Sequence, residues 1–263
     1  MERENDPGAK SRKERLAVLR GQEAHQRELQ EIADNSRAET LAKRIQQRRR
    51  NEEASGIKRQ GGCNAQTMRC PEARVMKLDT PECCKGHIRT IMADLAKLMD
   101  KAGIRWWADY GTLLGYYNFG GLIPWDKDGD LGILGEDREK LLELQPTLLG
   151  MGYHATYAPP RPTQRFRTGD RMKVKLSSRN HTNVDIFIWH ERPGGILDRI
   201  NYIGADLYKG REFPKEWVLP LERGQWEGID ISIPREGKKL AEWRYGERWQ
   251  EPLRVKHPSE ARE

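Results

Sequence analysis

Every aromatic residue of this 263-residue chain lies beyond residue 60, and this distribution sets where a hydrophobic core can form. The sequence holds 8 Trp, 8 Tyr and 4 Phe, and residues 1–60 contain none of them. Aromatic side chains bury large apolar areas in a core, so the first 60 residues have little with which to build one. We therefore expect a charged segment over 1–60, helical or disordered, and one folded domain over 61–263.

The N-terminal segment also carries much of the net charge. Its 15 basic and 11 acidic residues supply +4 of the formal +7. Its sparse apolar residues keep no sustained heptad, so we expect a solvated helix, with self-association through it as a second interpretation. The basic cluster at 43–50 has no aromatic residue among it for base stacking, which argues against a nucleic-acid partner.

No transmembrane helix is expected, because the sequence has no run of 18 apolar residues. The charged opening residues lack the apolar stretch of a signal peptide. These features predict a cytoplasmic protein. A Golgi lumenal protein is the alternative if a leader or anchor is missing from this chain.

Helical and strand patterns alternate after residue 80, which predicts an α/β (α+β) domain with a mixed sheet and flanking helices. Thr80 is the expected N-cap of a helix that Gly103 closes. A second helix is expected over 136–150, and a turn at Gly111 and Thr112. Strands are expected at 104–108, 130–134, 165–167, 172–176 and 184–189.

Three carboxylates alternate within five residues, at Asp126, Asp128 and Asp130. Alternate side chains of a strand share a face, so Asp128 and Asp130 should converge, with Asp126 at the strand entrance. Like charges at this spacing repel, which makes a hard divalent cation, Mg²⁺ or Mn²⁺, their natural partner. A solvated acidic turn is the competing interpretation, but apolar residues on both sides favour the mouth of a buried strand. A calcium loop would need Gly and Glu where Leu131 and Asp137 stand.

A fourth acid, Asp185, lies inside the apolar run 184–189. Burying an isolated carboxylate is costly unless it is paired or bound to metal, so we expect Asp185 to be the third metal ligand. Upstream, Gly111 and Thr112 lie where close backbone approach and free amides can hold a phosphate. A Gly-Thr pair, then alternating acids, then a lone strand acid matches the layout of the nucleotidyltransferase fold.

Four basic residues alternate along the expected strands before Asp185 and are candidates for holding phosphate oxygens. A solvated strand face explains them equally well. They are Arg165, Arg167, Lys173 and Lys175.

All four cysteines lie close together, at Cys63, Cys70, Cys83 and Cys84. Without a secretory signal, such a cluster more often binds metal than forms disulfides. Cys83 and Cys84 are expected at a helix start, where the helix dipole favours thiolates, and a loop with Cys63 and Cys70 could complete a tetrahedral structural zinc site. Two disulfides, or buried thiols without a ligand, are the alternatives.

Longer motifs around the acids resemble a known family. They cover roughly residues 83–252 and are similar to the signature of the LicD family, which includes bacterial phosphocholine transferases and eukaryotic fukutin-related proteins. The motifs are DYGTLLG at 109–115, GLIPWDKDGDL at 121–131, VDIF at 184–187, Phe213-Pro214, Glu227-Gly228 with Ile233-Pro234, and Tyr245-Gly246 with Pro252.

The resemblance implies a metal-dependent phosphotransferase that moves phosphocholine or an alditol phosphate from a CDP-linked donor to a glycan hydroxyl and releases CMP. The donors it suggests are CDP-choline, CDP-ribitol and CDP-glycerol. In this chemistry Asp126, Asp128, Asp130 and Asp185 are the catalytic acids, and the last three hold the metal. Two other functions stay open: a nucleotidyltransferase that releases pyrophosphate, and a non-catalytic scaffold or binding protein.

Overall fold

The computed structural model describes residues 63–66, 79–160, 170–199 and 212–251. The chain divides into two units, Met1–Lys58 and Arg59–Glu263, and every described residue belongs to the second. Our expectations for 1–60, for Cys70 and for the strand with Arg165 and Arg167 therefore lie outside the described residues. Within the described residues, no helix combines the length and the apolar character needed to cross a bilayer.

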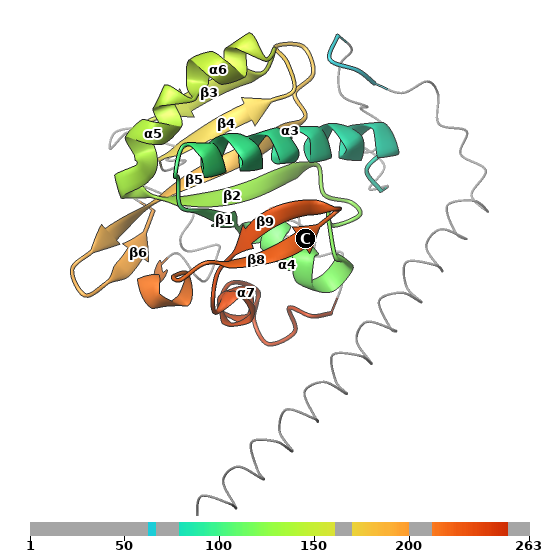
Figure 1. Ribbon diagram of the computed structural model, residues 1–263. Helices are drawn as coiled ribbons and strands as arrows, with labels where there is room; N and C mark the ends of the chain where they lie inside the picture. The colour runs from blue at the N-terminus through green and yellow to red at the C-terminus, as the bar shows by residue number, and fades with distance from the viewer. Residues whose placement is uncertain (1–62, 67–78, 161–169, 200–211, 252–263) are drawn as a thin grey trace, which may run out of the picture. The chain divides into compact units, whose positions relative to one another are not determined.

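A mixed sheet forms the centre of this unit, and its strand order is β1-β2-β5-β4-β3 (Figure 1). Strands β2 and β5 run parallel, and the other pairs are antiparallel. β6 extends the sheet from β5 and pairs with β7, while β8 and β9 form a separate hairpin. The strands are β1 Trp106–Ala108, β2 Asp128–Leu134, β3 His154–Ala158, β4 Arg171–Lys175, β5 Asn183–Arg192, β6 Ile196–Asp198, β7 Glu212–Pro214, β8 Glu222–Trp226 and β9 Ile229–Ile233.

Helices flank the sheet, as the sequence predicted. α3 crosses one face beside β2 and β5 (Figure 1), and it buries an apolar stripe that includes Ile88, Leu95 and Met99. α4 packs against β2 and α7. The helices are α3 Glu82–Lys101, α4 Tyr110–Phe119, α5 Arg138–Glu143, α6 Gln145–Gly150 and α7 Gly237–Tyr245, with short 3₁₀ turns η1 Gly135–Asp137 and η2 Lys215–Trp217.

Three local expectations were wrong. Pro81, not Thr80, occupies the N-cap of α3, because the Thr80 hydroxyl donates instead to the backbone carbonyl of Asp126. The helix expected over 136–150 is divided into η1, α5 and α6. Pro146 accounts for the second break, because its ring removes a backbone donor and clashes with the preceding turn.

The third concerns Gly111 and Thr112, which were expected to form a turn before a short segment. They lie instead in the first turn of α4, which Asp109 caps through its side chain. The Gly111 amide in this turn therefore points out of a helix N-terminus toward the start of β2.

Candidate active site

The parallel pairing of β2 and β5 brings the predicted acids together. In this register Asp130 lies opposite Asp185, and Asp128 lies opposite Asn183. Residues that pair directly across two strands project from the same face of a sheet. Asp128, Asp130 and Asp185 therefore share one face, as the sequence predicted for the first two.

Gly129 identifies that face by pointing the other way. A Cβ atom built on Gly129 would meet Met92 and Ile88 of α3. Since neighbouring residues of a strand alternate between faces, Asp128 and Asp130 project away from α3, toward the start of α4. The acids thus lie between the sheet and the N-terminus of a helix.

The first turn of α4 holds Asp130 in place. The backbone N–H of Gly111 donates to Oδ2 of Asp130 at 2.9 Å, and the backbone N–H of Asp130 donates to Oγ1 of Thr112 at 2.8 Å. Gly111 and Thr112 were expected to hold a phosphate, and that contact stays a prediction. In the structure these two residues bind and orient a candidate metal ligand.

Asp126 converges on the same point. A Cβ atom on Gly111 would lie 2.6 Å from Oδ2 of Asp126 and 3.0 Å from Oδ2 of Asp130. Burial, with the charge of Asp128, raises the pKa of Asp126 to about 7. Burial and the three neighbouring acids also raise the pKa of Asp130 well above its ordinary value. This mutual repulsion is what a bound divalent cation would relieve.

Asp185 is buried, and cations of β4 accompany it. Nζ of Lys173 lies 3.0 Å from Oδ2 of Asp185, and Nη1 of Arg171 lies 3.6 Å from Oδ1. Asn183 donates to the same carboxylate at 3.2 Å. Burial raises the pKa of Asp185, and the two cations oppose that rise. Pairing with Lys173 and Arg171 therefore offsets part of the free-energy cost of burying Asp185, a cost that the sequence led us to expect a metal ion to offset.

The alternating basic residues of β4 begin at Arg171, two residues before the first one that the sequence predicted on this strand. Lys173 lies opposite Asp185, and Lys175 lies opposite Asn183, so both share the face of the acids. Arg171 belongs to the same alternating row and was missed, although its spacing of two from Lys173 was a usable signal.

The donor set fits a hard divalent ion, because carboxylate oxygens are the ligands that Mg²⁺ and Mn²⁺ prefer. Asp128, Asp130 and Asp185 would hold it, with Asp126 beside them. Among the described residues, however, only the three cysteines form a group of three whose donor atoms all lie within 4.8 Å of one another. Holding one ion between the acids therefore requires their side chains to draw closer.

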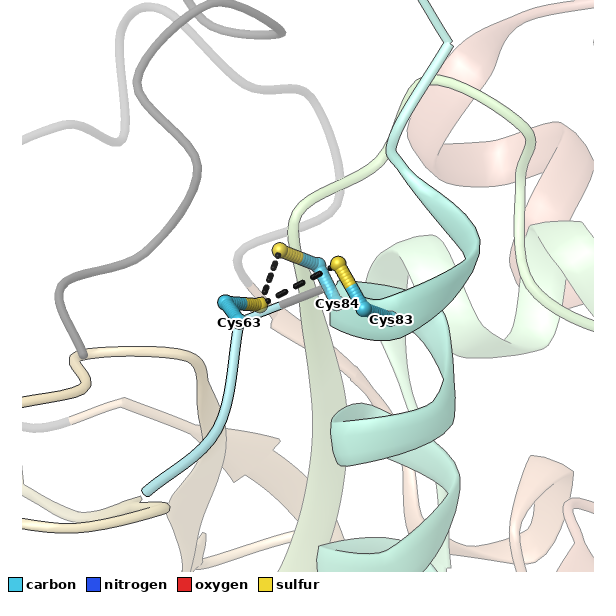
Figure 2. Close-up of side chains that lie close together, drawn as sticks. All are labelled: Cys63, Cys83 and Cys84. Carbon is cyan, nitrogen blue, oxygen red and sulfur yellow. Dashed lines mark hydrogen bonds between the residues drawn. The ribbon is translucent and has the colours of Figure 1, made fainter. Parts of the chain in front are cut away.

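The thiols of Cys63, Cys83 and Cys84 lie within 4.8 Å of one another, close enough to share one metal ion. Sγ of Cys63 lies 3.2 Å from Sγ of Cys83 and 3.4 Å from Sγ of Cys84 (Figure 2). These separations are far longer than the roughly 2.05 Å of a disulfide bond. They are close to the roughly 3.8 Å between two ligands of a tetrahedral site with Zn–S bonds of about 2.3 Å. Cys83 and Cys84 stand in the first turn of α3, as predicted, and His87 contacts the Cys63 carbonyl at 2.8 Å.

A buried ion pair behind the acids was not predicted. Arg244 of α7 pairs with Asp109, whose other carboxylate oxygen accepts the indole N–H of Trp189 at 2.9 Å. Both partners are almost fully buried. Asp109 directly follows β1 and lies two residues before Gly111, and this position was a weak signal of a functional role. Nothing local in the sequence indicates that its partner lies on α7.

A mixed sheet with acids from two parallel neighbouring strands, beside a helix N-terminus that carries a Gly-Thr pair, agrees with the nucleotidyltransferase layout expected from the sequence. The family model described as "LicD/FKTN/FKRP, nucleotidyltransferase domain" matches residues 103–236, about half of the chain. The chain belongs to this family. The match spans β1 to β9 and includes all four acids.

Curated relatives carry specific names. The human protein "Ribitol 5-phosphate transferase FKRP" is 28% identical over 195 residues, which cover 70% of this chain and 38% of that protein. The mouse "Ribitol-5-phosphate transferase FKTN" is 27% identical over 163 residues, 61% of this chain and 32% of that protein. The chain thus spans well under two thirds of the length of these relatives. Among solved structures, the lincomycin-bound lincosamide antibiotic adenylyltransferase LnuA aligns with a TM-score of 0.35 and 14% identity, over 62% of this chain and 85% of that chain.

Proposed function

We propose that this chain is a metal-dependent phosphotransferase that moves an alditol phosphate, such as ribitol 5-phosphate, from a CDP-linked donor to a glycan hydroxyl and releases CMP. The observation that carries the proposal is the shared face of Asp128, Asp130 and Asp185, with the Asp126 carboxylate beside Gly111. The names of FKRP and FKTN favour an alditol phosphate over phosphocholine as the transferred group.

The acids and the helix turn divide the work. Phosphoryl transfer needs alignment and neutralised charge more than covalent chemistry. An Mg²⁺ or Mn²⁺ ion held by Asp128, Asp130 and Asp185 would supply the charge that offsets the donor diphosphate and the departing CMP. Lys175, on the same sheet face, remains a candidate for contacting phosphate oxygens, as do Arg165 and Arg167 outside the described residues.

Asp126 is the better of two candidates for the base. When the acceptor oxygen bonds to phosphorus and the bond to CMP breaks, the hydroxyl proton must go to a nearby group. Asp185 is buried and committed to Lys173 and Asn183, whereas Asp126 is partly exposed and lies beside the proposed metal ligands Asp128 and Asp130. We assign the proton to the Asp126 carboxylate.

CMP release tests the proposal. The full chain is incubated with a panel of glycans and one donor, which is CDP-ribitol, CDP-glycerol, CDP-choline or a nucleoside triphosphate. Each reaction contains Mg²⁺, Mn²⁺ or EDTA, and CMP and pyrophosphate are measured. Metal-dependent CMP release with an alditol donor, absent in Asp130→Asn, is the expected result. Pyrophosphate release from a nucleoside triphosphate would favour a nucleotidyltransferase, and no turnover of any nucleotide would favour a scaffold.

We also propose that Cys63, Cys83 and Cys84, together with Cys70, hold a structural zinc ion. The support is the approach of two thiols at the start of α3, Cys83 and Cys84, to within 3.4 Å of the Cys63 thiol. Elemental analysis of protein purified without added metal should find about one zinc per chain, with four thiols countable under denaturing conditions without reductant. Absence of zinc together with absence of reactive thiols would indicate disulfides instead.

A further inference from the structure

The Asp109–Arg244 pair lies beside Asp130, because the backbone of Asp109 is hydrogen-bonded to the backbone of Asp130. The side chains of Asp109 and Arg244 are 0% and 2% exposed. The Asp109 carboxylate also accepts the Trp189 indole and the backbone N–H of Tyr110 at 3.1 Å. Three donors, from α4, β5 and α7, therefore meet at one carboxylate, which leaves Asp109 little freedom.

Stability alone is a poor explanation for this pair. Nε and Nη2 of Arg244 are buried without a hydrogen-bond partner among the described residues. Burying a guanidinium with unpaired donors carries a desolvation cost, and a buried ion pair is weak evidence for stability. Because burial of Arg244 carries this desolvation cost, its role is better explained by the residues that it holds in position.

What it holds is the start of α4. The Arg244 guanidinium lies over the Tyr110 ring, 4.1 Å from the ring centroid. Tyr110 has a φ of 33°, a conformation that costs energy for any residue with a side chain. The Asp109 carboxylate and the stacked guanidinium contact this residue from two sides, so Arg244 constrains the strained turn both directly and through Asp109.

The first turn of α4, with Asp109 before it, holds Asp130 in place. The backbone N–H of Asp109 donates to the carbonyl of Asp130 at 3.0 Å. Gly111 binds the Asp130 carboxylate, and Thr112 accepts its backbone N–H. Residues 109–112 therefore contact Asp130 at its carbonyl, its amide and its side chain, and Arg244 contacts this segment from α7.

We infer that Arg244 is a positioning residue that acts through Asp109 and Tyr110 to hold the Gly111 amide against Asp130. The consequence for metal binding rests on the proposed function. Residues that orient metal ligands from behind change metal affinity by about 10–100-fold when they are lost.

The chain offers a matched control at the other end of β2. Asp137 has a side chain that is 1% exposed, pairs with Arg105 and stands at the start of a helix, like Asp109. Its partners are Arg105 and Lys140, and neither forms a hydrogen bond or ion pair with the four acids among the described residues. Asp109→Asn and Asp137→Asn therefore each remove one charge from a buried carboxylate at a helix start, although the cations paired with Asp137 are 41% and 47% exposed and Arg244 is 2% exposed. Only the first substitution touches the proposed chain of contacts.

The decisive measurement is amide hydrogen exchange at Gly111, followed by NMR in the full chain without metal. Exchange is compared with global stability from chemical unfolding, so that local opening is separated from overall destabilisation. Arg244→Met and Asp109→Asn should speed Gly111 exchange by more than the change in global stability accounts for. Arg244→Lys, which restores the charge, should recover part of the protection, and Asp137→Asn should show no excess.

A parallel Mn²⁺ titration distinguishes this inference from the proposed function. If wild type binds Mn²⁺, Arg244→Met should weaken it by about tenfold or more while Asp137→Asn leaves it unchanged. If wild type binds none, the proposed function fails, yet excess Gly111 exchange in Arg244→Met would still support positioning. Gly111 exchange that only follows global stability in Arg244→Met, Arg244→Lys and Asp109→Asn would overturn the inference. Should Arg244→Met not fold, the other two variants decide it.

Discussion

Asp130 of β2 lies directly opposite Asp185 of β5, and Lys173 of β4 lies opposite Asp185 on its other side. Three adjacent strands thus carry a row of two acids and one cation across one face of the sheet. The cation neutralises only the acid next to it, since Nζ of Lys173 is 3.0 Å from Asp185. Asp130 has no such cation beside it among the described residues, and burial together with the charges of Asp128, Asp126 and Asp185 raises its pKa well above the ordinary value, which disfavours its charged form.

The first prediction is that Asp130→Asn lowers CMP release by orders of magnitude. Asn keeps an oxygen for the Gly111 N–H but removes a negative charge from the metal site. Its melting temperature without metal should equal or exceed that of wild type, because one source of repulsion is lost. Asp230→Asn, an exposed acid of β9, is the control and should alter neither quantity. Wild-type turnover in Asp130→Asn would end the metal hypothesis.

The second prediction concerns Gly111. In Gly111→Ala the new Cβ would lie 2.6 Å from Oδ2 of Asp126, closer than a carbon and an oxygen normally approach, so Asp126 or α4 must shift. We expect activity and Mn²⁺ affinity to fall at least about tenfold. Gly150→Ala is the matched control, since it also lies in a helix and its Cβ would meet nothing within 4 Å. Equal activity in both variants would show that the acids do not converge on Gly111.

The third prediction separates the two lysines of β4. Lys173→Met leaves Arg171 as the only cation paired with the buried Asp185 among the described residues, so the free energy of unfolding should fall by about 1–3 kcal/mol. This is less than for a fully buried pair, because Lys173 is a quarter exposed. Lys175→Met, with the same change in charge, should stay within about 0.5 kcal/mol. Chemical unfolding at pH 7 measures both. Equal losses would mean that the Lys173–Asp185 contact contributes nothing specific.

The sequence predicted what depends on local pattern. The strands around Asp130 and Asp185 follow from apolar runs with turn residues beside them, and α3 follows from its apolar spacing. Pro146 already indicated in the sequence that a continuous helix over 136–150 would be interrupted. The Thr80 hydroxyl was misassigned because a partner distant in sequence, the Asp126 carbonyl, takes it from the helix.

The missed parts of the site depend on register and tertiary contact. That Asp185 has Lys173 and Arg171 beside it follows only once β4 is aligned with β5, and a shift of one residue would turn both cations to the other face. The pairing of Asp109 with Arg244 joins the end of β1 to the last described helix. No local propensity or spacing records such a contact.

The last prediction is a pH dependence of the metal-free protein. The Asp126 pKa is raised by burial and by Asp128 to about 7 in the folded state, against about 3.9 in an unfolded chain. Between these values the folded state binds more protons, so this group makes the free energy of unfolding fall as pH rises from about 4 to about 7. Asp130 and Asp185 shift in the same direction. With EDTA present, unfolding by denaturant should show wild type losing on the order of 2 kcal/mol across this window relative to Asp126→Asn. Added Mn²⁺ should reduce the difference by stabilising the charged acids, and Asp230→Asn should retain the wild-type slope. Parallel pH profiles for wild type and Asp126→Asn without metal would contradict a buried, repelling acid at this position.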